Sequence, residues 1–271
     1  MSVSLPEPPT REQLREHLVR TRIAGRVATS RENNLGNFQR LADRDRYYMF
    51  GLEHAGTWTF AEILALMAKQ CGVSADASHR AGVDTIDPDR TIDALNAMAA
   101  RIRRAAAAGE RVLLATGHPA GLLPIYLELV RDLEAHGCPV LTPAIGWSYH
   151  TQTQYGPQER HVRYIGGVAI LSSGGALHHT HSPRPMEAIL RELRADGQPW
   201  PQLVIADHGW AGAAGAAGVD AVGFADCNDP ALFVGEAEGT VGSVVPLDDN
   251  VLPHYYAPLT AYLRCHADPQ S

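Results

Sequence analysis

The sequence predicts an α/β fold, namely a three-layer, Rossmann-like and mostly parallel sheet preceded by a helical N-terminal cap. From residue 110 onward, apolar stretches of four to six residues alternate with helical stretches of about a dozen residues. This alternation is typical of parallel βαβ units with helices on both faces of the sheet. Before residue 110, the stretches with a clear apolar period repeat at helical spacing.

The composition is that of a globular protein whose partner is a small-molecule substrate. The chain has 271 residues, 45% of them hydrophobic and 20% charged, so it can bury a substantial core without disulfides. Its net charge is −7 and it carries no basic stripe, which argues against nucleic acid as a partner. No stretch approaches the roughly 18 apolar residues of a membrane span, so no membrane partner is expected. The oligomeric state stays unknown at this stage.

The cysteines and the N-terminal residues predict a cytoplasmic protein. Cys71, Cys138, Cys227 and Cys265 form no C-x-x-C pair, and we expect free thiols in a reducing compartment. The N-terminal stretch MSVSLPEPPTREQLREHLVR contains no apolar core, so we do not expect it to be a signal peptide.

Three helices are predicted in the N-terminal part, which we interpret as a cap formed by residues 1–109. They cover residues 9–23, 57–70 and 88–108. Residues 24–52 are polar and lack a clear period, so no regular element is predicted there. The catalytic domain is expected to occupy residues 110–271.

The predicted catalytic domain is built on short apolar strands. We expect strands at residues 111–115, 139–142, 168–171, 203–206, 221–224 and 243–247. Helices are predicted between them, the first over residues 121–136. The stretch HTQTQYGPQER (150–160) is expected to form a long loop or a hairpin near the site.

Polar and small residues follow five of these strands, at the edge where a parallel sheet binds its ligands. The five strands lead into Thr116, Ser172, Asp207, Asp226 and Asp248, whereas the opposite edge shows no comparable pattern. Solvation of the surface alone does not explain five such ends on one edge. We therefore predict the functional site at this edge.

The acidic residues at these strand ends suit a divalent metal ion. Asp207, Asp226 and Asn228 offer the oxygen ligands that Mg²⁺ or Mn²⁺ prefers, and we predict them as metal ligands. His208 is an alternative to Asn228 as the further ligand. The nearby histidines make Zn or Fe an alternative metal.

Small and basic residues at the same edge suit an anionic substrate. Backbone N–H groups approach a phosphate closely where small residues lead into a helix. An arginine can clamp the anion, and a histidine of the cap can reach into the site. The predicted substrate-binding residues are Thr116, Gly117, Ser172, Ser173, Gly174, Gly175, Arg184 and His54.

Four histidines are predicted to serve as acid, base or phosphate donor. These catalytic candidates are His118, His179, His181 and His208. The sequence does not decide which of them is the acid and which is the base. The histidines of the HHTH stretch (178–181) are either metal ligands or substrate contacts.

Several of these residues also have a purely structural interpretation. Asp207 and His208 are equally well explained as a helix N-cap and its polar neighbour. For Asp229, which precedes a proline, helix capping is the favoured interpretation, so Asp226 is expected to matter more. The Asp-Asp-Asn stretch 248–250 is favoured as a simple turn.

The stretch GWAGAAGAAG (209–218) follows Asp207 and His208 and consists almost entirely of small residues. We expect a helix whose backbone approaches the ligand and whose other face packs tightly on the sheet, since Gly and Ala permit both. Trp210 is expected to form a wall of the pocket.

Three motifs together resemble a family of actinobacterial proteins called simply "phosphatase". They are TGHPAG (116–121), SSGGALHHTHSP (172–183) and DHGWAGAAGAAGVDAVGFADCNDP (207–230), and the resemblance covers nearly the whole chain. More distantly, the chain resembles the metal-dependent carbohydrate-phosphate phosphatases of the DUF89 type. Those combine a helical N-terminal part with a Rossmann-like domain and bind their metal through an Asp-Asn pair and a later Asp. That resemblance places Asp207 and Asp226 at the two Asp positions, with His208 where that family has Asn.

We therefore expect a hydrolase, specifically a metal-dependent phosphatase that acts on a small phosphorylated metabolite (a phosphomonoester). A divalent metal would polarise the phosphoryl oxygens and lower the pKa of the attacking water. Two alternatives stay open: a metal-assisted hydrolase or lyase that acts on a non-phosphorylated metabolite, and a non-catalytic nucleotide- or metabolite-binding module. The substrate itself cannot be identified from the sequence.

Overall fold

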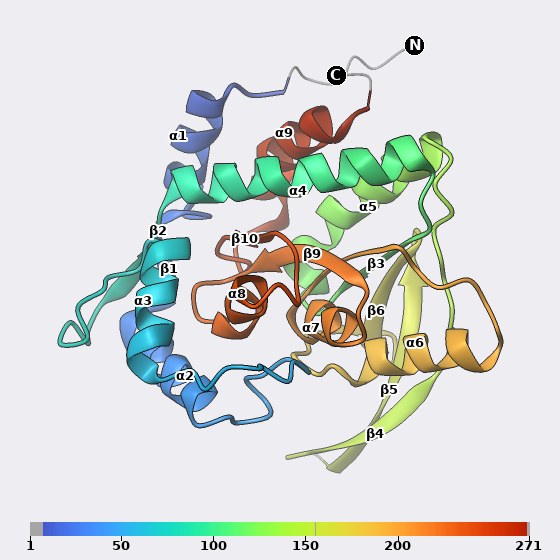
Figure 1. Ribbon diagram of the computed structural model, residues 1–271, viewed down its shortest axis with the longest axis horizontal. Coiled ribbons are helices and arrows are strands. Elements are labelled where there is room, and N and C mark those ends of the chain that lie inside the picture. The colour runs from blue at the N-terminus through green and yellow to red at the C-terminus, as the bar shows by residue number, and fades with distance from the viewer. Residues whose placement is uncertain (1–7, 155, 270–271) are drawn as a thin grey trace.

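A mixed sheet of eight strands lies at the centre of the computed structural model, which describes residues 8–154 and 156–269 (Figure 1). The strands are β3 (Val112–Thr116), β4 (Ser148–Thr153), β5 (Gly156–Ile165), β6 (Val168–Ser173), β7 (Ala176–His178), β8 (Leu203–Asp207), β9 (Asp220–Ala225) and β10 (Val244–Pro246). Their order is β10-β9-β8-β3-β6-β5-β4, with β7 paired to β6. Strands β10 to β6 in this order are parallel, whereas β5, β4 and β7 are antiparallel. The prediction of a mostly parallel α/β sheet is confirmed.

Helices cover both faces of the sheet and make the fold three-layered (Figure 1). One face carries α4 (Pro88–Ala108), α5 (Pro119–Ala135) and α9 (Ala257–Ala267); α4 and α5 pack on the sheet, and α9 packs on both of these helices. The other face carries α6 (Arg184–Ala195), α7 (His208–Ala216) and α8 (Pro230–Ala237). Because both faces are covered, strands such as β3 and β8 are buried along their whole length and are almost entirely apolar.

The direction of chain winding reverses between β3 and β8, which are neighbours in the sheet. Strand β3 leads through α5 toward β6 on one side, and β8 leads through α7 to β9 on the other. Right-handed crossovers place these two helices on opposite faces of the sheet. The carboxyl ends of β3 and β8 therefore border the crevice in which open α/β sheets bind ligands.

Helix α7 is buried from His208 to Gly215, and tight backbone packing explains its small residues. A Cβ atom at Gly209 would lie 2.2 Å from the carbonyl oxygen of His181, so the loop before α6 leaves no room for a side chain. The small residues thus serve packing of neighbouring segments. Trp210 is fully buried in the core, so the prediction that it forms a pocket wall is wrong.

The N-terminal segment contains two strands besides its helices. Its elements are α1 (Arg11–Thr21), β1 (Gly25–Ser30), α2 (Arg31–Ala42), α3 (Phe60–Gln70) and β2 (Val83–Ile86), followed by α4. Strands β1 and β2 form an antiparallel pair, and α2 and α3 pack on α8. The boundary at residue 109 stays a prediction.

The sequence interpretation missed β1 and α2 because the inner face of α2 is partly polar. Arg31 and Asn34 are fully buried there, and both donate hydrogen bonds of 2.8 Å to Asp84 of β2. An apolar period cannot reveal a helix whose buried face carries a satisfied polar network.

Two further local predictions have clear outcomes. No strand forms at 139–142, where Val140 makes a single parallel bridge to Val112. The stretch 150–160 belongs to the β4–β5 hairpin, and a hairpin was one of the two forms predicted for it.

The last strand is followed by a short 3₁₀ helix, η1 (Pro253–Tyr256). Within the described residues, no helix combines the length and the apolar character that crossing a membrane requires.

Candidate functional site

Acidic and histidine side chains gather where the central strands end. Seven of them form what we call the ligand cluster: His179, His181, His208, Asp226, Asp229, Asp248 and Asp249. They come from the β7–α6 loop, the start of α7, the β9–α8 loop and the segment after β10. The predicted edge of the sheet therefore carries the cluster, at the reversal point between β3 and β8.

Asp207 orients His208 and is itself completely buried. Its Oδ1 accepts hydrogen bonds from the backbone N–H of Gly117 (2.6 Å) and from Nδ1 of His208 (2.7 Å), and its Oδ2 accepts one from the Tyr126 hydroxyl (2.8 Å). Burial opposes ionisation, but the hydrogen bond and charge of His208 outweigh it and lower the pKa of Asp207. The carboxylate is thus ionised and holds the imidazole in place.

The interpretation of Asp207 as a helix cap is wrong, since its side chain makes no capping hydrogen bond to α7. Among the described residues, Asp207 also belongs to none of the three groups that could hold a metal ion. Its position behind His208 explains why, because protein donors already occupy both of its oxygens. Asp207 is better explained as the residue that positions a ligand than as a ligand.

His208 points its other nitrogen into the cluster. Nε2 lies 3.3 Å from Oδ2 of Asp229 and 3.3 Å from Oδ2 of Asp249. Burial alone would lower its pKa, but the bonds to Asp207 and Asp229 raise it well above the usual value. The residue also has a φ of 48°, a left-handed conformation that is costly for a non-glycine residue and is often found at functional sites.

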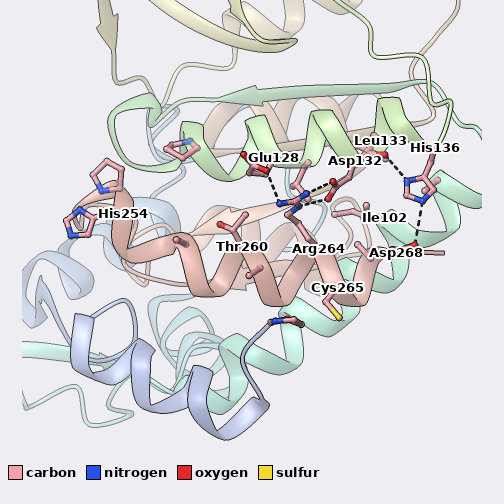
Figure 2. A pocket seen from close by; sticks show the side chains of 18 residues that line it. Ile102, Glu128, Asp132, Leu133, His136, His254, Thr260, Arg264, Cys265 and Asp268 are labelled. Atoms are coloured by element: carbon pink, nitrogen blue, oxygen red, sulfur yellow. Dashed lines mark hydrogen bonds and ion pairs between the residues drawn. The ribbon is translucent and has the colours of Figure 1, made fainter. Parts of the chain in front are cut away.

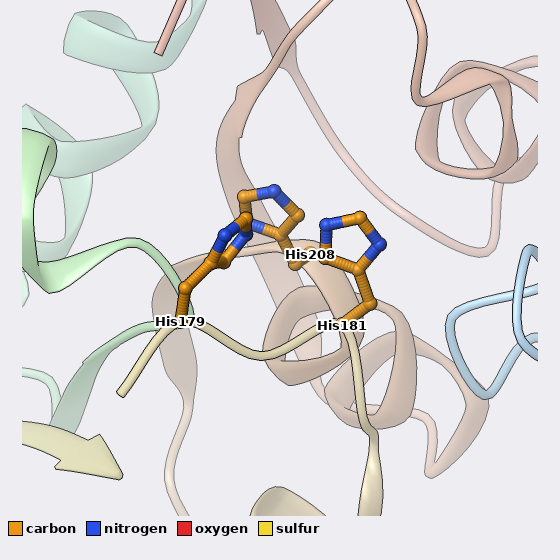
Figure 3. A group of neighbouring side chains, drawn as sticks. All are labelled: His179, His181 and His208. Atoms are coloured by element: carbon orange, nitrogen blue, oxygen red, sulfur yellow. The ribbon is translucent and has the colours of Figure 1, made fainter. Parts of the chain in front are cut away.

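His179 and His181 place two more imidazoles beside His208, as Figure 3 shows. The ring centroids lie 4.7 to 5.2 Å apart for the three pairs. Burial and the neighbouring His208 charge lower the pKa of His179 to about 3 and that of His181 to about 4. Both rings are therefore neutral at neutral pH and keep a lone pair that can bind a metal.

Asp226, Asp248 and Asp249 form the acidic end of the cluster. Asp226 accepts hydrogen bonds of 2.6 Å from the Thr29 hydroxyl and from the Cys227 backbone N–H. Burial and the charge of Asp248 raise its pKa to about 7. Burial likewise raises the pKa of Asp249 well above its usual range, and its Oδ2 is buried without a hydrogen-bond partner.

The cluster contains three overlapping groups that could hold a metal ion. They are His179–His181–His208, His208–Asp229–Asp249 and Asp226–Asp248–Asp249, and within each group the ligand atoms lie within 4.8 Å of one another. Within the described part of the chain, Asp229 and Asp249 form ion pairs with histidines only, and Asp226 and Asp248 form none. Buried carboxylates without lysine or arginine partners are typical of cation sites.

The structural interpretations of Asp229 and of stretch 248–250 are corrected by this geometry. Asp229 makes no capping hydrogen bond to α8, and its carboxylate instead faces His208. Asp248 does accept a hydrogen bond from the Asn250 N–H, as a turn requires, but Asp249 projects into the cluster. Asp229 and Asp249 are therefore candidate ligands that the sequence interpretation undervalued.

The loop after β3 lies beside the cluster. A Cβ atom at Gly117 would lie 2.4 Å from the Thr180 carbonyl oxygen and 3.1 Å from Asp207 Oδ1, which explains the glycine. Thr116 accepts a hydrogen bond from the His118 N–H. Nδ1 of His118 is buried and has no hydrogen-bond partner in the part of the chain that the structure describes. It lies 3.7 Å from Oδ1 of Asp249, and burial and the charge of His208 lower the pKa of His118.

The structure places several predicted substrate contacts outside the cluster. Ser172 and Ser173 end β6, and Gly174 and Gly175 form the β6–β7 turn, so the expectation that a helix begins after them is wrong. Arg184 begins α6 and stacks on the Tyr149 ring at 4.3 Å.

Two further predicted residues also contact other parts of the chain. His54 is buried 3.5 Å from Glu238, just beyond the C-terminal end of α8, whereas the cluster lies at the N-terminal end of that helix. The backbone carbonyl of Asn228 accepts a hydrogen bond from Asn37. As a metal ligand, the Asn228 side chain stays a prediction.

Three functional candidates escaped the sequence interpretation. Thr29 and Tyr126 hold site carboxylates through their hydroxyls. Arg160 on β5 is only 5% exposed, yet within the described residues it forms no ion pair, and its Nε has no hydrogen-bond partner. Its charge is close enough to contribute, after burial, to the lowered pKa of His178, the neighbour of His179. Nothing in the local sequence marks any of the three.

A cavity of about 790 Å³ lies away from the cluster, between α4, α5 and α9 (Figure 2). Its lining is mostly apolar, and its arginine is neutralised. Arg264 donates hydrogen bonds of 2.6 and 2.7 Å to Asp132 and lies 2.8 Å from Glu128. Because this arginine is already paired and no member of the ligand cluster lines the cavity, we place the chemistry at the strand ends.

Comparison with known proteins identifies relatives over nearly the whole chain. The model of a family described as "Phosphatase" matches residues 9–270. A curated protein of Streptomyces coelicolor named Phosphatase SCO2771 is 50% identical over 265 residues, which cover 97% of this chain and 98% of that protein. The range matched by the family model contains all seven positions of the ligand cluster.

Proposed function

The chain belongs to the Phosphatase family, and from this premise we propose that it hydrolyses phosphomonoesters of small metabolites with the help of a divalent metal ion. Family membership supports a hydrolase that acts on phosphate esters. The metal dependence and the monoester substrate are our proposal, and the ligand cluster supports them. The predicted ligand set changes accordingly: His208, Asp229, His179 and His181 hold the ion, and Asp207 positions His208.

The observation that carries this proposal is the orientation of His208. Asp207 accepts the hydrogen bond from Nδ1, which directs Nε2 toward Asp229 and Asp249 at 3.3 Å. Metal-binding histidines almost always donate their other N–H to a carboxylate or carbonyl, which fixes the tautomer and the ring orientation. His179 and His181 add two further imidazoles beside His208, with ring centroids 4.7 to 5.2 Å apart for the three pairs.

The donors indicate which metals fit. Three imidazoles with a carboxylate suit Mn, Zn or Fe, whereas carboxylates alone suit Mg or Mn. Mn²⁺ suits both sets of donors. A bound divalent ion would neutralise phosphoryl charge and lower the pKa of water.

The remaining side chains are assigned by their contacts. His118 is neutral, because burial lowers its pKa, and its free Nδ1 faces the cluster, so it fits a base that takes the proton of the attacking water. Arg160 fits an anion-binding role, since a buried guanidinium that has no acidic partner among the described residues is unfavourable until an anion binds. Arg184 stacks on Tyr149, the cross-strand neighbour of Arg160.

The experiment is a release assay for inorganic phosphate over a panel of monoesters and diesters. Protein freed of metal with a chelator is compared with the same protein after addition of Mn²⁺, Mg²⁺ or Zn²⁺. We expect release from monoesters only, and only after metal is restored. Release from no ester under any metal would refute the proposed function, and equal release by metal-free protein would refute its metal dependence.

A further inference from the structure

We infer that the site holds a second divalent cation, bound by the carboxylates of Asp226, Asp248 and Asp249 beside the histidine-bound ion. The inference rests on the proposed function and deepens it, since paired cations can hold both the attacking and the leaving oxygen of a phosphate ester. One oxygen from each of the three residues lies within 4.8 Å of those of the other two. This spacing allows a single cation to contact all three carboxylates.

The ligands of the second cation differ in kind from those of the first. Asp226, Asp248 and Asp249 offer only carboxylate oxygens, which favour a hard cation such as Mg²⁺ or Mn²⁺. The neighbouring group offers three imidazoles, which favour a softer cation such as Zn²⁺. The two positions therefore select cations of different character.

The burial of these three carboxylates favours a bound cation. Asp226, Asp248 and Asp249 are 4%, 2% and 7% exposed. Within the described part of the chain, Asp226 and Asp248 form no ion pair, and Asp249 approaches only His118 and His208. Buried charges without partners are strongly unfavourable, and a divalent cation would offset two of them.

Asp249 connects the two positions. Its Oδ2 is buried and has no hydrogen-bond partner among the described residues, which is rare for a carboxylate oxygen in a folded protein. The same oxygen lies 3.3 Å from Nε2 of His208, and the residue belongs to the groups on both sides. Its carboxylate would therefore be shared by the two cation positions.

The N-terminal segment fixes the two outer carboxylates. The Thr29 hydroxyl donates to Oδ2 of Asp226 at 2.6 Å, and the Ala28 N–H donates to Oδ2 of Asp248 at 3.1 Å. Hydrogen bonds of this kind orient carboxylate ligands. Since both donors lie on β1, the N-terminal segment completes the second cation position.

The test counts cations per chain in the full-length protein. Metal-free protein is equilibrated with Mn²⁺ by dialysis and analysed for Mn content and by electron paramagnetic resonance. Wild type is expected to bind two Mn²⁺ and to show an exchange-coupled spectrum, as two ions about 3.5–4 Å apart produce.

The variant Asp226→Asn is expected to bind one Mn²⁺ with an uncoupled spectrum. Its fold should persist, because the amide oxygen can accept from the Cys227 N–H while the amide nitrogen donates to the Thr29 hydroxyl. Asp196→Asn is the matched control: this carboxylate is exposed just after α6, and two coupled ions should remain.

Saturation of wild type at one Mn²⁺, or two coupled ions in Asp226→Asn, would overturn the inference. Phosphate release from the same samples separates it from the proposed function. Two coupled ions without release from any monoester would support the second cation and refute the function. One ion with undiminished release would refute the second cation alone.

Discussion

Nδ1 of His208 lies 2.7 Å from Oδ1 of Asp207, and this hydrogen bond determines which nitrogen of His208 faces the ligand cluster. The carboxylate also accepts from Gly117 and Tyr126, so its position is fixed from three sides. The pair explains why a buried strand ends in an acid and a histidine. Replacing Asp207 therefore tests whether a residue that only orients His208, and is not itself a metal ligand, affects metal affinity.

Asp207→Asn is expected to weaken metal binding by roughly 10- to 100-fold, as loss of a carboxylate behind a histidine ligand does. The charge that stabilises the buried His208 imidazole is then lost, so the free energy of unfolding should fall by about 1–3 kcal/mol. Metal titration and thermal unfolding measure the two effects. Tyr126→Phe removes a donor from the same carboxylate and should keep the metal affinity; equal weakening in both variants would contradict the role of Asp207.

His118→Gln is expected to lower kcat by about 10²- to 10⁴-fold, the usual loss when a general base is removed. Its metal content should stay at the wild-type level, because His118 is not among the ligand groups of the described residues. Steady-state kinetics and elemental analysis on the same sample measure both. A loss of metal that parallels the loss of activity would instead make His118 a ligand.

Arg160→Met is expected to raise KM for the phosphate ester by roughly 10- to 100-fold, since a charged hydrogen bond to the anion is lost. At the same time, the free energy of unfolding should be at least that of wild type, because the substitution removes a buried charge that forms no ion pair among the described residues. Arg163→Met, which alters an exposed arginine of the same strand, should change neither quantity. An unchanged KM in Arg160→Met would exclude the residue from substrate binding.

Glu236 on α8 gives the fold a pH dependence that is independent of the site. Burial raises its pKa from 4.5 to about 7, so the folded state favours the protonated form. The stability that this preference contributes is fully present below pH 4.5 and is lost as the pH rises to about 7. By linkage the loss is roughly 3 kcal/mol.

Glu236→Gln is expected to remove this part of the pH dependence and to stabilise the protein at neutral pH. Its amide oxygen can accept from the Val244 N–H, while its nitrogen donates to Oε1 of Gln70, for which the described residues of the wild-type protein offer no hydrogen-bond partner. Chemical denaturation between pH 4.5 and pH 8 tests this. Parallel stability curves for the two proteins would show that the ionisation of Glu236 is not the cause.

The parallel sheet was predictable because covered strands are continuous apolar runs, as in β3 and β8. Helix α2 was not, because Arg31 and Asn34 turn inward and form hydrogen bonds with Asp84. Val140 looked like a strand residue but makes only one bridge. Prediction from the spacing of apolar residues is limited in this way: the spacing indicates which apolar residues are buried, but it does not indicate a buried network of polar side chains.

The site was predictable to the extent that it follows the strand-end rule. His118, His179, His181, His208 and Asp226 lie together at the predicted edge. Asp229 and Asp249 were undervalued because, from the local sequence alone, a helix cap accounts for Asp229 and a turn accounts for Asp249. Long-range contacts decide between such explanations, and the contact of Thr29 with Asp226 spans 197 residues of sequence.

The most direct test measures phosphate release against the amount of metal bound while metal-free protein is titrated with Mn²⁺. We predict that release from a responsive monoester rises in step with bound metal and vanishes on chelation. Asp229→Asn, which removes a carboxylate 3.3 Å from Nε2 of His208, should bind less metal and release correspondingly less phosphate while it stays folded. Undiminished release by the metal-free protein, or full activity and full metal content in Asp229→Asn, would contradict the account.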